Sequence, residues 1–249
     1  MEASEHVAEL REQGYTILPG VYSAEYVQRF RAELERIYEE VGRPHLVFDG
    51  DKQLAPGITL RLSGLTIRKV LHYAPSLAEG YIHPDVAEVL LAALGDEMRM
   101  EMTSCMMSDA AREMHHWHMH IGGLDEASPP PKEIVEREAI GRLTLLVYLN
   151  DIHPGAGQLL IYPRRLTDPT ECPFRGLSEP WEGQVALNCP AGTAVLTDER
   201  TWHASTPREE PGFRMFFGGQ FASGEMPKTR AFDESLPAFH AQIPWVRLD

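Results

Sequence analysis

Apolar residues recur every third or fourth position in two early segments of the chain, as one face of a helix requires. The longer segment follows Ser23 and ends before Gly42. Ser23 can accept a hydrogen bond at the helix start, and Gly42 suits its end. Its inward positions are Val27, Phe30, Leu34, Ile37 and Val41. A second helix is predicted from Pro84, a favoured first-turn residue, to Gly95.

The remainder of the first third is less regular. A short helix is predicted over residues 4–13, and YTIL at 15–18 is typical of a strand closed by Pro19 and Gly20. GITLRLSGL, residues 57–65, is compatible with a further strand. We therefore expect residues 1–96 to form a largely helical N-terminal portion packed on a core.

From residue 97 onward the hydrophobic period changes to two, the period of a strand. No helix of useful length separates these segments, so an antiparallel sandwich or barrel is expected rather than a parallel sheet. The predicted class is α+β with a mainly β core at 97–221, followed by a tail or lid at 222–249, all in one domain. The candidate strands are 97–107, 114–120, 143–149, 157–163, 183–189, 193–198 and 214–221.

Composition narrows the possible partners. The 249 residues carry a net charge of −14, which disfavours binding to nucleic acid or to an anionic membrane. Cys105, Cys172 and Cys189 form no CxxC motif, which favours a reducing compartment. The N-terminus has no signal-peptide pattern, so a cytoplasmic protein that acts on a small molecule is expected.

The stretch MHHWHMH, residues 114–120, contains a dense group of histidines. In a strand, His116, His118 and His120 would share one face, and His115 would point to the other. Imidazoles two positions apart can bind one ion, and imidazole suits iron, copper, nickel and zinc. His116 is a candidate acid/base or outer group, and a register with His116 and His118 as the pair is the alternative. A surface cluster without metal is the simpler interpretation.

A metal site needs a further ligand from elsewhere in the chain. His203 follows the predicted strand TAVLTD, and Ser205 lies two residues beyond it. Arg214 begins a later strand. Taken alone, neither residue indicates a binding site. An arginine on a strand, such as Arg214, is usually a surface or ion-paired residue, and a serine such as Ser205 is usually a turn residue.

Taken together, these segments resemble the phytanoyl-CoA dioxygenase family of Fe(II)- and 2-oxoglutarate-dependent oxygenases. The family's W-H-x-D motif corresponds to Trp117-His118-Met119-His120. Residues 143–165 look like its L-N-D strand pair, and AGTAVLTDERTWHAS at 191–205 looks like its second histidine segment. Residues 128–138 and the tail after 222 do not follow the family pattern.

The resemblance implies a double-stranded β-helix, or jelly roll, with Fe(II) as the metal and 2-oxoglutarate and O2 as co-substrates. His118 and His203 would bind iron. Arg214 would pair with the far carboxylate of 2-oxoglutarate, the two-pronged geometry that guanidinium favours, and Ser205 would hydrogen-bond it. Oxidation of a small organic substrate by hydroxylation, desaturation or cyclisation would follow, with the substrate itself left open.

The family pattern places a carboxylate where this chain has His120. Three interpretations remain open at this point. His118, His120 and His203 bind the metal together; or Asp125, Glu126 or Glu113 supplies an oxygen; or iron binding is lost. Two other functions are compatible with these patterns: a three-histidine metal dioxygenase or hydrolase that does not use 2-oxoglutarate, and a non-catalytic ligand-binding jelly roll.

Overall fold

The computed structural model describes residues 1–121, 137–229 and 231–248. Helix α2 begins where the sequence predicts, because Ser23 Oγ accepts a hydrogen bond from the Tyr26 amide at 3.2 Å. The helices are α1 (Ala3–Gln13), α2 (Ala24–Glu40), α3 (Val70–Tyr73) and α4 (Pro84–Leu94), with 3-10 turns η1 (Pro75–Leu77) and η2 (Leu236–Phe239).

The strands form an 8-stranded sheet in the order β1-β10-β7-β12-β5-β4-β3-β2 and a 4-stranded sheet in the order β6-β11-β8-β9. Neighbouring strands in both sheets pair antiparallel. The strands are β1 (Tyr15–Leu18), β2 (Lys52–Ala55), β3 (Ile58–Arg61), β4 (Gly64–Arg68), β5 (Arg99–Ser108), β6 (His115–His118), β7 (Arg142–Tyr148), β8 (Leu159–Ile161), β9 (Val185–Ala186), β10 (Ala194–Asp198), β11 (His203–Ser205) and β12 (Arg214–Ala222).

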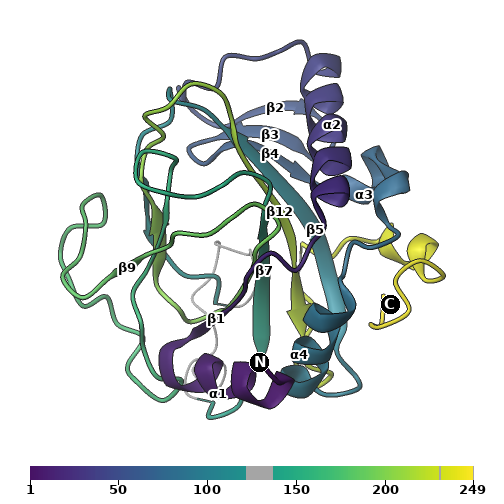
Figure 1. Ribbon diagram of the computed structural model, residues 1–249, viewed down its shortest axis with the longest axis vertical. Coiled ribbons are helices and arrows are strands. Elements are labelled where there is room, and N and C mark those ends of the chain that lie inside the picture. The colour runs from purple at the N-terminus through teal and green to yellow at the C-terminus, as the bar shows by residue number, and fades with distance from the viewer. Residues whose placement is uncertain (122–136, 230, 249) are drawn as a thin grey trace.

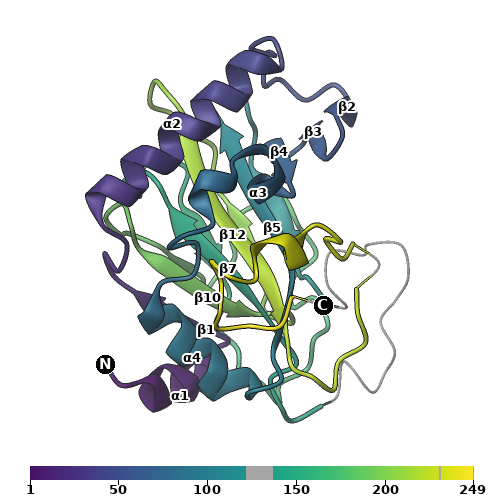
Figure 2. The same ribbon diagram turned by 90° about the vertical axis from the view of Figure 1, so that its right-hand side faces the viewer.

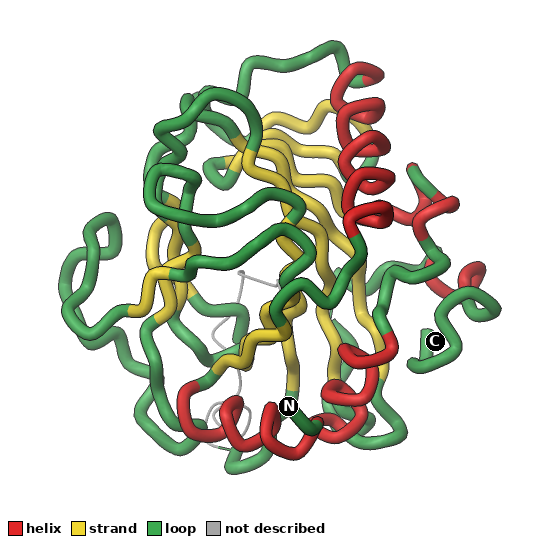
Figure 3. Tube along the Cα trace, viewed as in Figure 1, coloured by secondary structure: helices red, strands yellow, loops and turns green. Residues whose placement is uncertain are grey.

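The helices lie together on one side of the large sheet. Figure 1 shows α2 beside the strands, and Figure 2, turned by 90°, shows α2, α3 and α4 in front of the large sheet, with α1 beside α4 at its lower end. Figure 3 shows the smaller sheet on the other side, among long loops. The expected double-stranded β-helix with flanking helices is therefore confirmed, and the open face of the large sheet is turned toward the small sheet.

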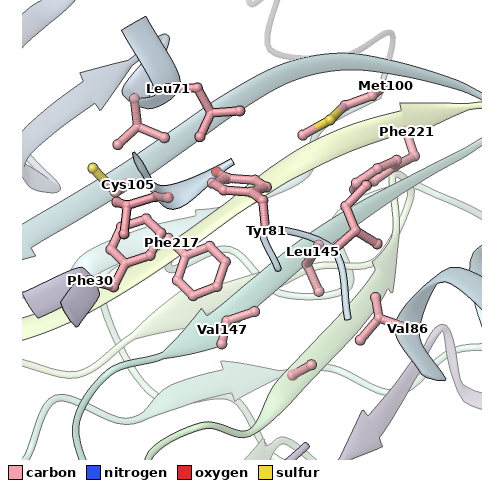
Figure 4. Close-up of a cluster of buried hydrophobic side chains, with 14 of the residues drawn as sticks. Phe30, Leu71, Tyr81, Val86, Met100, Cys105, Leu145, Val147, Phe217 and Phe221 are labelled. Carbon is pink, nitrogen blue, oxygen red and sulfur yellow. The ribbon is translucent and has the colours of Figure 1, made fainter. Parts of the chain in front are cut away.

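The main hydrophobic core fills the space between the large sheet and the helices (Figure 4). Phe30 of α2 stacks on Phe217 of β12 with ring centroids 4.1 Å apart, and both side chains are fully buried. Tyr81 joins them and donates a hydrogen bond to the Gly218 carbonyl at 2.5 Å. This core fixes β12 and its neighbours, so the opposite face of the same strands is held rigidly for the site.

The first third contributes more strand than the sequence analysis expected. β1 pairs with β10, and the β2–β3–β4 ribbon extends the large sheet beyond β5. Residue 97 is therefore not a boundary between a helical portion and a β portion. The alternating burial of Ile58 and Leu60 in β3, and of Leu65 and Ile67 in β4, was too short a signal to identify two strands.

The described tail, residues 222–229 and 231–248, does not form the expected lid. None of these residues lines the cavity between the two sheets. Leu236, Ile243 and Val246 instead pack into the core on the helix side, and the Arg247 amide donates to the Met98 carbonyl at 3.1 Å. The hydrophobic effect holds this later part of the tail on the helix side, because its apolar side chains are buried there.

Most other expected strands are present with altered ends. The 183–189 segment shortens to β9, and the 114–120 segment ends as a strand at His118. β11 and α3 were not predicted, since each is only a few residues long. The loop expected at 128–138 lies largely outside the described residues. No helix in the described part of the chain is long and apolar enough to cross a membrane.

Candidate metal centre

The candidate metal centre lies on the small sheet, where β6 and β11 pair. His203 stands opposite His118, whereas Ser205 stands opposite His115, so β6 has an extra residue between the two pairs. This β-bulge bends the strand and re-aims its side chains. The bulge brings histidines from both strands to one point facing the large sheet.

The rings of His118, His120 and His203 meet there. One nitrogen from each lies within 4.8 Å of the others, a spacing that suits three ligands of a single ion. The ring centroids are 4.2 Å apart for His118 and His203, 5.1 Å for His118 and His120, and 4.7 Å for His120 and His203. His120 follows the end of β6, and its amide donates to the Glu199 carbonyl at 2.9 Å, which fixes its position.

Hydrogen bonds at the Nδ1 atoms select which nitrogen is left for a metal. His118 Nδ1 donates to the His116 carbonyl at 2.7 Å, and His203 Nδ1 donates to the Thr201 carbonyl at 2.9 Å. His120 Nδ1 lies 3.3 Å from the Thr144 hydroxyl. A carbonyl accepts only from N–H, so Nε2 carries the lone pair in the first two rings. This arrangement is typical of metal-binding histidines, whose outer nitrogen is oriented by a second group.

The surroundings keep His120 and His203 uncharged at neutral pH. Burial, together with His118, lowers the pKa of His203 to about 3. Burial followed by the neighbouring His203 and His118 lowers the pKa of His120 well below its usual value. Neutral imidazole is the form that binds a metal, so both groups are ready to do so at neutral pH.

His115 and His116 lie differently from the strict alternation that the sequence suggested. The His115 ring is 4.4 Å from the His118 ring and lines the same cavity, whereas the His116 side chain is exposed at the edge of that cavity. Burial, then His118 and Arg112, lowers the pKa of His115 to about 2. The bulge accounts for the difference, because an extra residue reverses the alternation on one side of it.

Of the three acidic residues considered as alternative metal ligands, the structure describes only Glu113. Glu113 is exposed and does not belong to the ligand cluster found among the described residues. Asp125 and Glu126 lie outside the described residues. Within residues 1–121, 137–229 and 231–248, the cluster suited to a metal at this point consists of histidines alone.

A cavity of about 440 Å³ adjoins the histidines between the two sheets. This volume is at the small end of the range for ligand pockets, roughly 300–1,000 Å³, and suits small organic molecules. The predicted residues Ser205 and Arg214 both line it, as does Tyr148. Its other walls include Arg61, Arg68, Ser104, Met106, Leu146, Phe216 and Gln220.

Arg214 lines the cavity with only 3% of its surface exposed. Its Nε donates to the Gly157 carbonyl at 2.6 Å, and its Nη2 donates to the Tyr148 hydroxyl at 3.3 Å. A Cβ at position 157 would lie 2.7 Å from Arg214 Cδ, and φ there is +83°. Glycine is therefore required for this approach. No carboxylate in the described part of the chain forms an ion pair with Arg214.

An aromatic layer supports the metal centre from behind. Trp117, between His116 and His118, points away from the cavity and stacks on Trp181 with centroids 4.2 Å apart. Its Nε1 donates to the Glu179 carbonyl at 2.9 Å. Trp202 precedes His203 and lies on the same side, 5.6 Å from Trp181. The tryptophans thus anchor the two strands from which the histidines project.

Sequence reasoning brought together residues that are far apart in the chain, but it missed others. His115 was assigned to the wrong face, and the parts that Thr144, Tyr148 and Arg112 play around the site were not anticipated. Tyr148 lies within LTLLVYL and looks like an ordinary core residue. Nothing in a single sequence marks it as the partner of Arg214.

The residues fit a first-row transition metal with an anionic chelating ligand. Three neutral nitrogen donors suit Fe(II), as they also suit zinc. The adjoining cavity leaves room for further ligands on the metal, and the unpaired Arg214 suits a carboxylate.

The comparisons with known proteins agree with this fold. No curated protein sequence matches the chain. Among solved structures, the non-heme α-ketoglutarate-dependent carbocyclase SnoK from nogalamycin biosynthesis is 23% identical, with TM-score 0.65 and coverage of 90% of this chain and 86% of that one. EctD from S. alaskensis with 2-oxoglutarate and 5-hydroxyectoine is 18% identical, with TM-score 0.63 and coverage of 88% and 76%.

HygX from Streptomyces hygroscopicus, with nickel and 2-oxoglutarate bound, is 15% identical, with TM-score 0.65 and coverage of 90% and 88%. At these identities the likeness establishes the shared fold. The family model of phytanoyl-CoA dioxygenase (PhyH) matches residues 10–216, from α1 into β12. The chain therefore belongs to the phytanoyl-CoA dioxygenase family, as its sequence motifs predicted, and is a dioxygenase of that family.

Proposed function

We propose that this protein is an Fe(II)- and 2-oxoglutarate-dependent oxygenase that acts on a small organic substrate, with iron held by His118, His120 and His203. Iron so bound would supply activation of O2, coupled to oxidative decarboxylation of 2-oxoglutarate. Membership of the family supports the reaction class. The observation that carries the metal assignment is the convergence of the three rings, with one nitrogen from each within 4.8 Å of the others.

The chain's own residues would divide the work. His118 and His203 are oriented by backbone carbonyls and His120 by the Thr144 hydroxyl, so the donor set is preorganised. Arg214 and Ser205 would bind the far carboxylate of 2-oxoglutarate. The walls formed by Met106, Leu146 and Phe216 would exclude water from the substrate. His116, exposed at the cavity edge, remains a candidate acid or base.

A zinc hydrolase or a three-histidine dioxygenase without 2-oxoglutarate is the second candidate, because catalytic zinc also favours three protein ligands. The buried Arg214 argues against it, since a metal-bound water would give that guanidinium no carboxylate to pair with. The net charge of −14 supports an enzyme that binds a small molecule and neither nucleic acid nor membrane. The lack of a CxxC motif among the three cysteines supports a cytoplasmic location.

Anaerobic titration tests the proposal. Fe(II) is added to metal-free protein, followed by 2-oxoglutarate, and the weak visible absorption of a chelated 2-oxo acid is recorded. We expect the absorption to appear and to saturate at equal amounts of protein, metal and 2-oxoglutarate. Tight zinc binding without any such absorption would refute the proposal in favour of the second candidate.

Two histidine variants make the titration specific. His203→Ala removes a ligand and should abolish both metal binding and the absorption. His72→Ala, at an exposed histidine on α3, is the matched control and should change neither. His120→Ala separates the possible ligand sets, because unaltered metal affinity in that variant would show that His120 is not a ligand.

A further inference from the structure

A second buried arginine lies close to Arg214. Arg112 is in the turn between β5 and β6, and only 2% of its surface is exposed. Its Nη2 donates to the Thr206 carbonyl at 2.7 Å, whereas its Nε and Nη1 are buried with no hydrogen-bond partner. Arginine remains charged in proteins, so most of the donors of this guanidinium are desolvated without compensation.

The two arginines are anchored on neighbouring backbone. Arg214 donates to the carbonyl of Gly157, and Arg112 donates to that of Thr206. These segments are hydrogen-bonded to each other, since the Thr206 amide donates to the Gln158 carbonyl at 3.0 Å. A Cβ at Gly157 would lie 2.7 Å from Arg214 Cδ and 3.6 Å from the Thr206 oxygen that accepts from Arg112. The guanidinium groups therefore flank one small region next to Ser205.

The electrostatics of this region are unbalanced. Burial and then the charge of Arg214 lower the pKa of Arg112 to about 9. Neither arginine forms an ion pair with a carboxylate in the described part of the chain. Burying a cation without a counter-ion destabilises the folded protein, and two such cations also repel each other. Two buried arginines without a carboxylate are typical of an anion-binding site, because the bound anion neutralises their positive charge.

We propose that Arg112 forms, with Arg214 and Ser205, a two-arginine receptor for the far carboxylate of the 2-oxo acid co-substrate. This inference rests on the proposed function. The unpaired Nε and Nη1 of Arg112 supply the additional donors, and Arg112 is thereby a specificity-determining residue. The receptor requires a second carboxylate, so it selects dicarboxylic 2-oxo acids over monocarboxylic ones.

Matched ligands and variants test this assignment. 2-Oxovalerate has the same chain length as 2-oxoglutarate but lacks the far carboxylate. The dissociation constants of both acids are measured by anaerobic calorimetry on the Fe(II)-loaded protein. Arg112→Met should weaken 2-oxoglutarate by roughly 10- to 100-fold, as expected for lost hydrogen bonds to a charged group, and should change 2-oxovalerate less than about twofold.

Two further variants guard against a purely structural effect. Arg112→Lys retains the charge and should recover part of the affinity for 2-oxoglutarate. Arg208→Met is the matched control, because Arg208 also donates to a nearby carbonyl, that of Ala156, but is paired with Glu210 at 3.6 Å. It should leave both dissociation constants unchanged.

The outcomes are distinguishable. Equal weakening of both acids in Arg112→Met, or no weakening of 2-oxoglutarate in either Arg112 variant, would overturn the role of Arg112 and leave the proposed function intact. If the wild-type protein bound Fe(II) but neither acid, the proposed function would fail, and the two-arginine receptor with it.

Discussion

Two pairs of buried arginines in this protein differ in whether a carboxylate lies beside them. Arg99 and Arg142 lie at the far end of the large sheet around Glu101, whose side chain is completely buried. Arg99 Nη2 donates to it at 3.0 Å and Arg142 Nε at 2.8 Å, with Glu199 3.6 Å from Arg142. Arg112 and Arg214 have no such carboxylate in the described part of the chain.

The difference distinguishes a structural cluster from a binding site. Around Glu101 the charges are balanced, and the cluster also holds the tail through the Met226 and Pro227 carbonyls and the Thr229 amide. Around Arg112 and Arg214 the described residues supply no carboxylate, so the positive charge there is available to a bound anion. Breaking the first pair should therefore cost folding free energy, whereas breaking the second should cost ligand affinity.

The largest effect is expected from Glu101→Gln, which leaves two buried arginines without their central carboxylate. We expect the free energy of unfolding to fall by about 3–5 kcal/mol, measured by urea denaturation. Glu97→Gln, which breaks the exposed ion pair with Arg247, is the control and should cost less than about 1 kcal/mol. A similarly small loss in Glu101→Gln would show that the cluster is not structural.

Arg214→Met makes the opposite test. Removing a cation that has no carboxylate partner among the described residues should change the stability of the ligand-free protein by less than about 1 kcal/mol, since methionine fills much of the same space. The affinity for 2-oxoglutarate should fall by roughly 30-fold or more, about 2 kcal/mol, with metal affinity nearly unchanged. Calorimetry and urea denaturation check the two parts. A stability loss as large as that of Glu101→Gln would contradict the comparison.

Acid should destabilise the folded protein, because protonation of the buried histidines adds positive charge next to Arg112 and Arg214. His115 has its pKa lowered to about 2, chiefly by burial, so below pH 6.5 the unfolded chain binds more protons than the folded protein. Stability then falls as pH falls, by up to about 1.4 kcal/mol per pH unit for this group. Urea denaturation of metal-free protein at pH 5, 6 and 7 should show a shallower slope for His115→Leu. Identical slopes would mean that His115 titrates normally.

His120→Asp should have the smallest effect, and it restores the carboxylate of the family motif. We expect metal affinity within about tenfold of wild type, because the carboxylate is also an iron ligand. The added negative charge should modestly weaken 2-oxoglutarate, a dianion. Metal titration and calorimetry measure both quantities. Complete loss of metal would show that the site is built for imidazole at this position.

The sequence predicted the parts of the molecule that depend on local pattern. The helix from Ser23, the strands with alternating apolar residues and the order of the family motifs all identify themselves within short windows. His118 and His203 could be associated because the family motifs fix their order, although pairing of β6 with β11 is a long-range contact.

Features that depend on tertiary packing were not predictable in this way. The bulge in β6 reverses the side of His115, and no residue type marks its position. Arg112 is a single charged residue in a turn, and only its burial beside Arg214 makes it notable. The tail was expected over the site, but its apolar residues Leu236, Ile243 and Val246 are buried in the core on the helix side.

The stacking of Trp117 on Trp181 has a practical consequence. The indole of Trp117 is part of the same short strand as the ligand His118, and it is buried with a fixed partner and a fixed hydrogen bond. Its fluorescence should therefore respond to a quenching ion such as Fe(II) or Ni(II) at the adjacent histidines. The exposed Trp245, in the tail, would contribute a constant background. The protein thus carries its own optical reporter of metal loading, without a label.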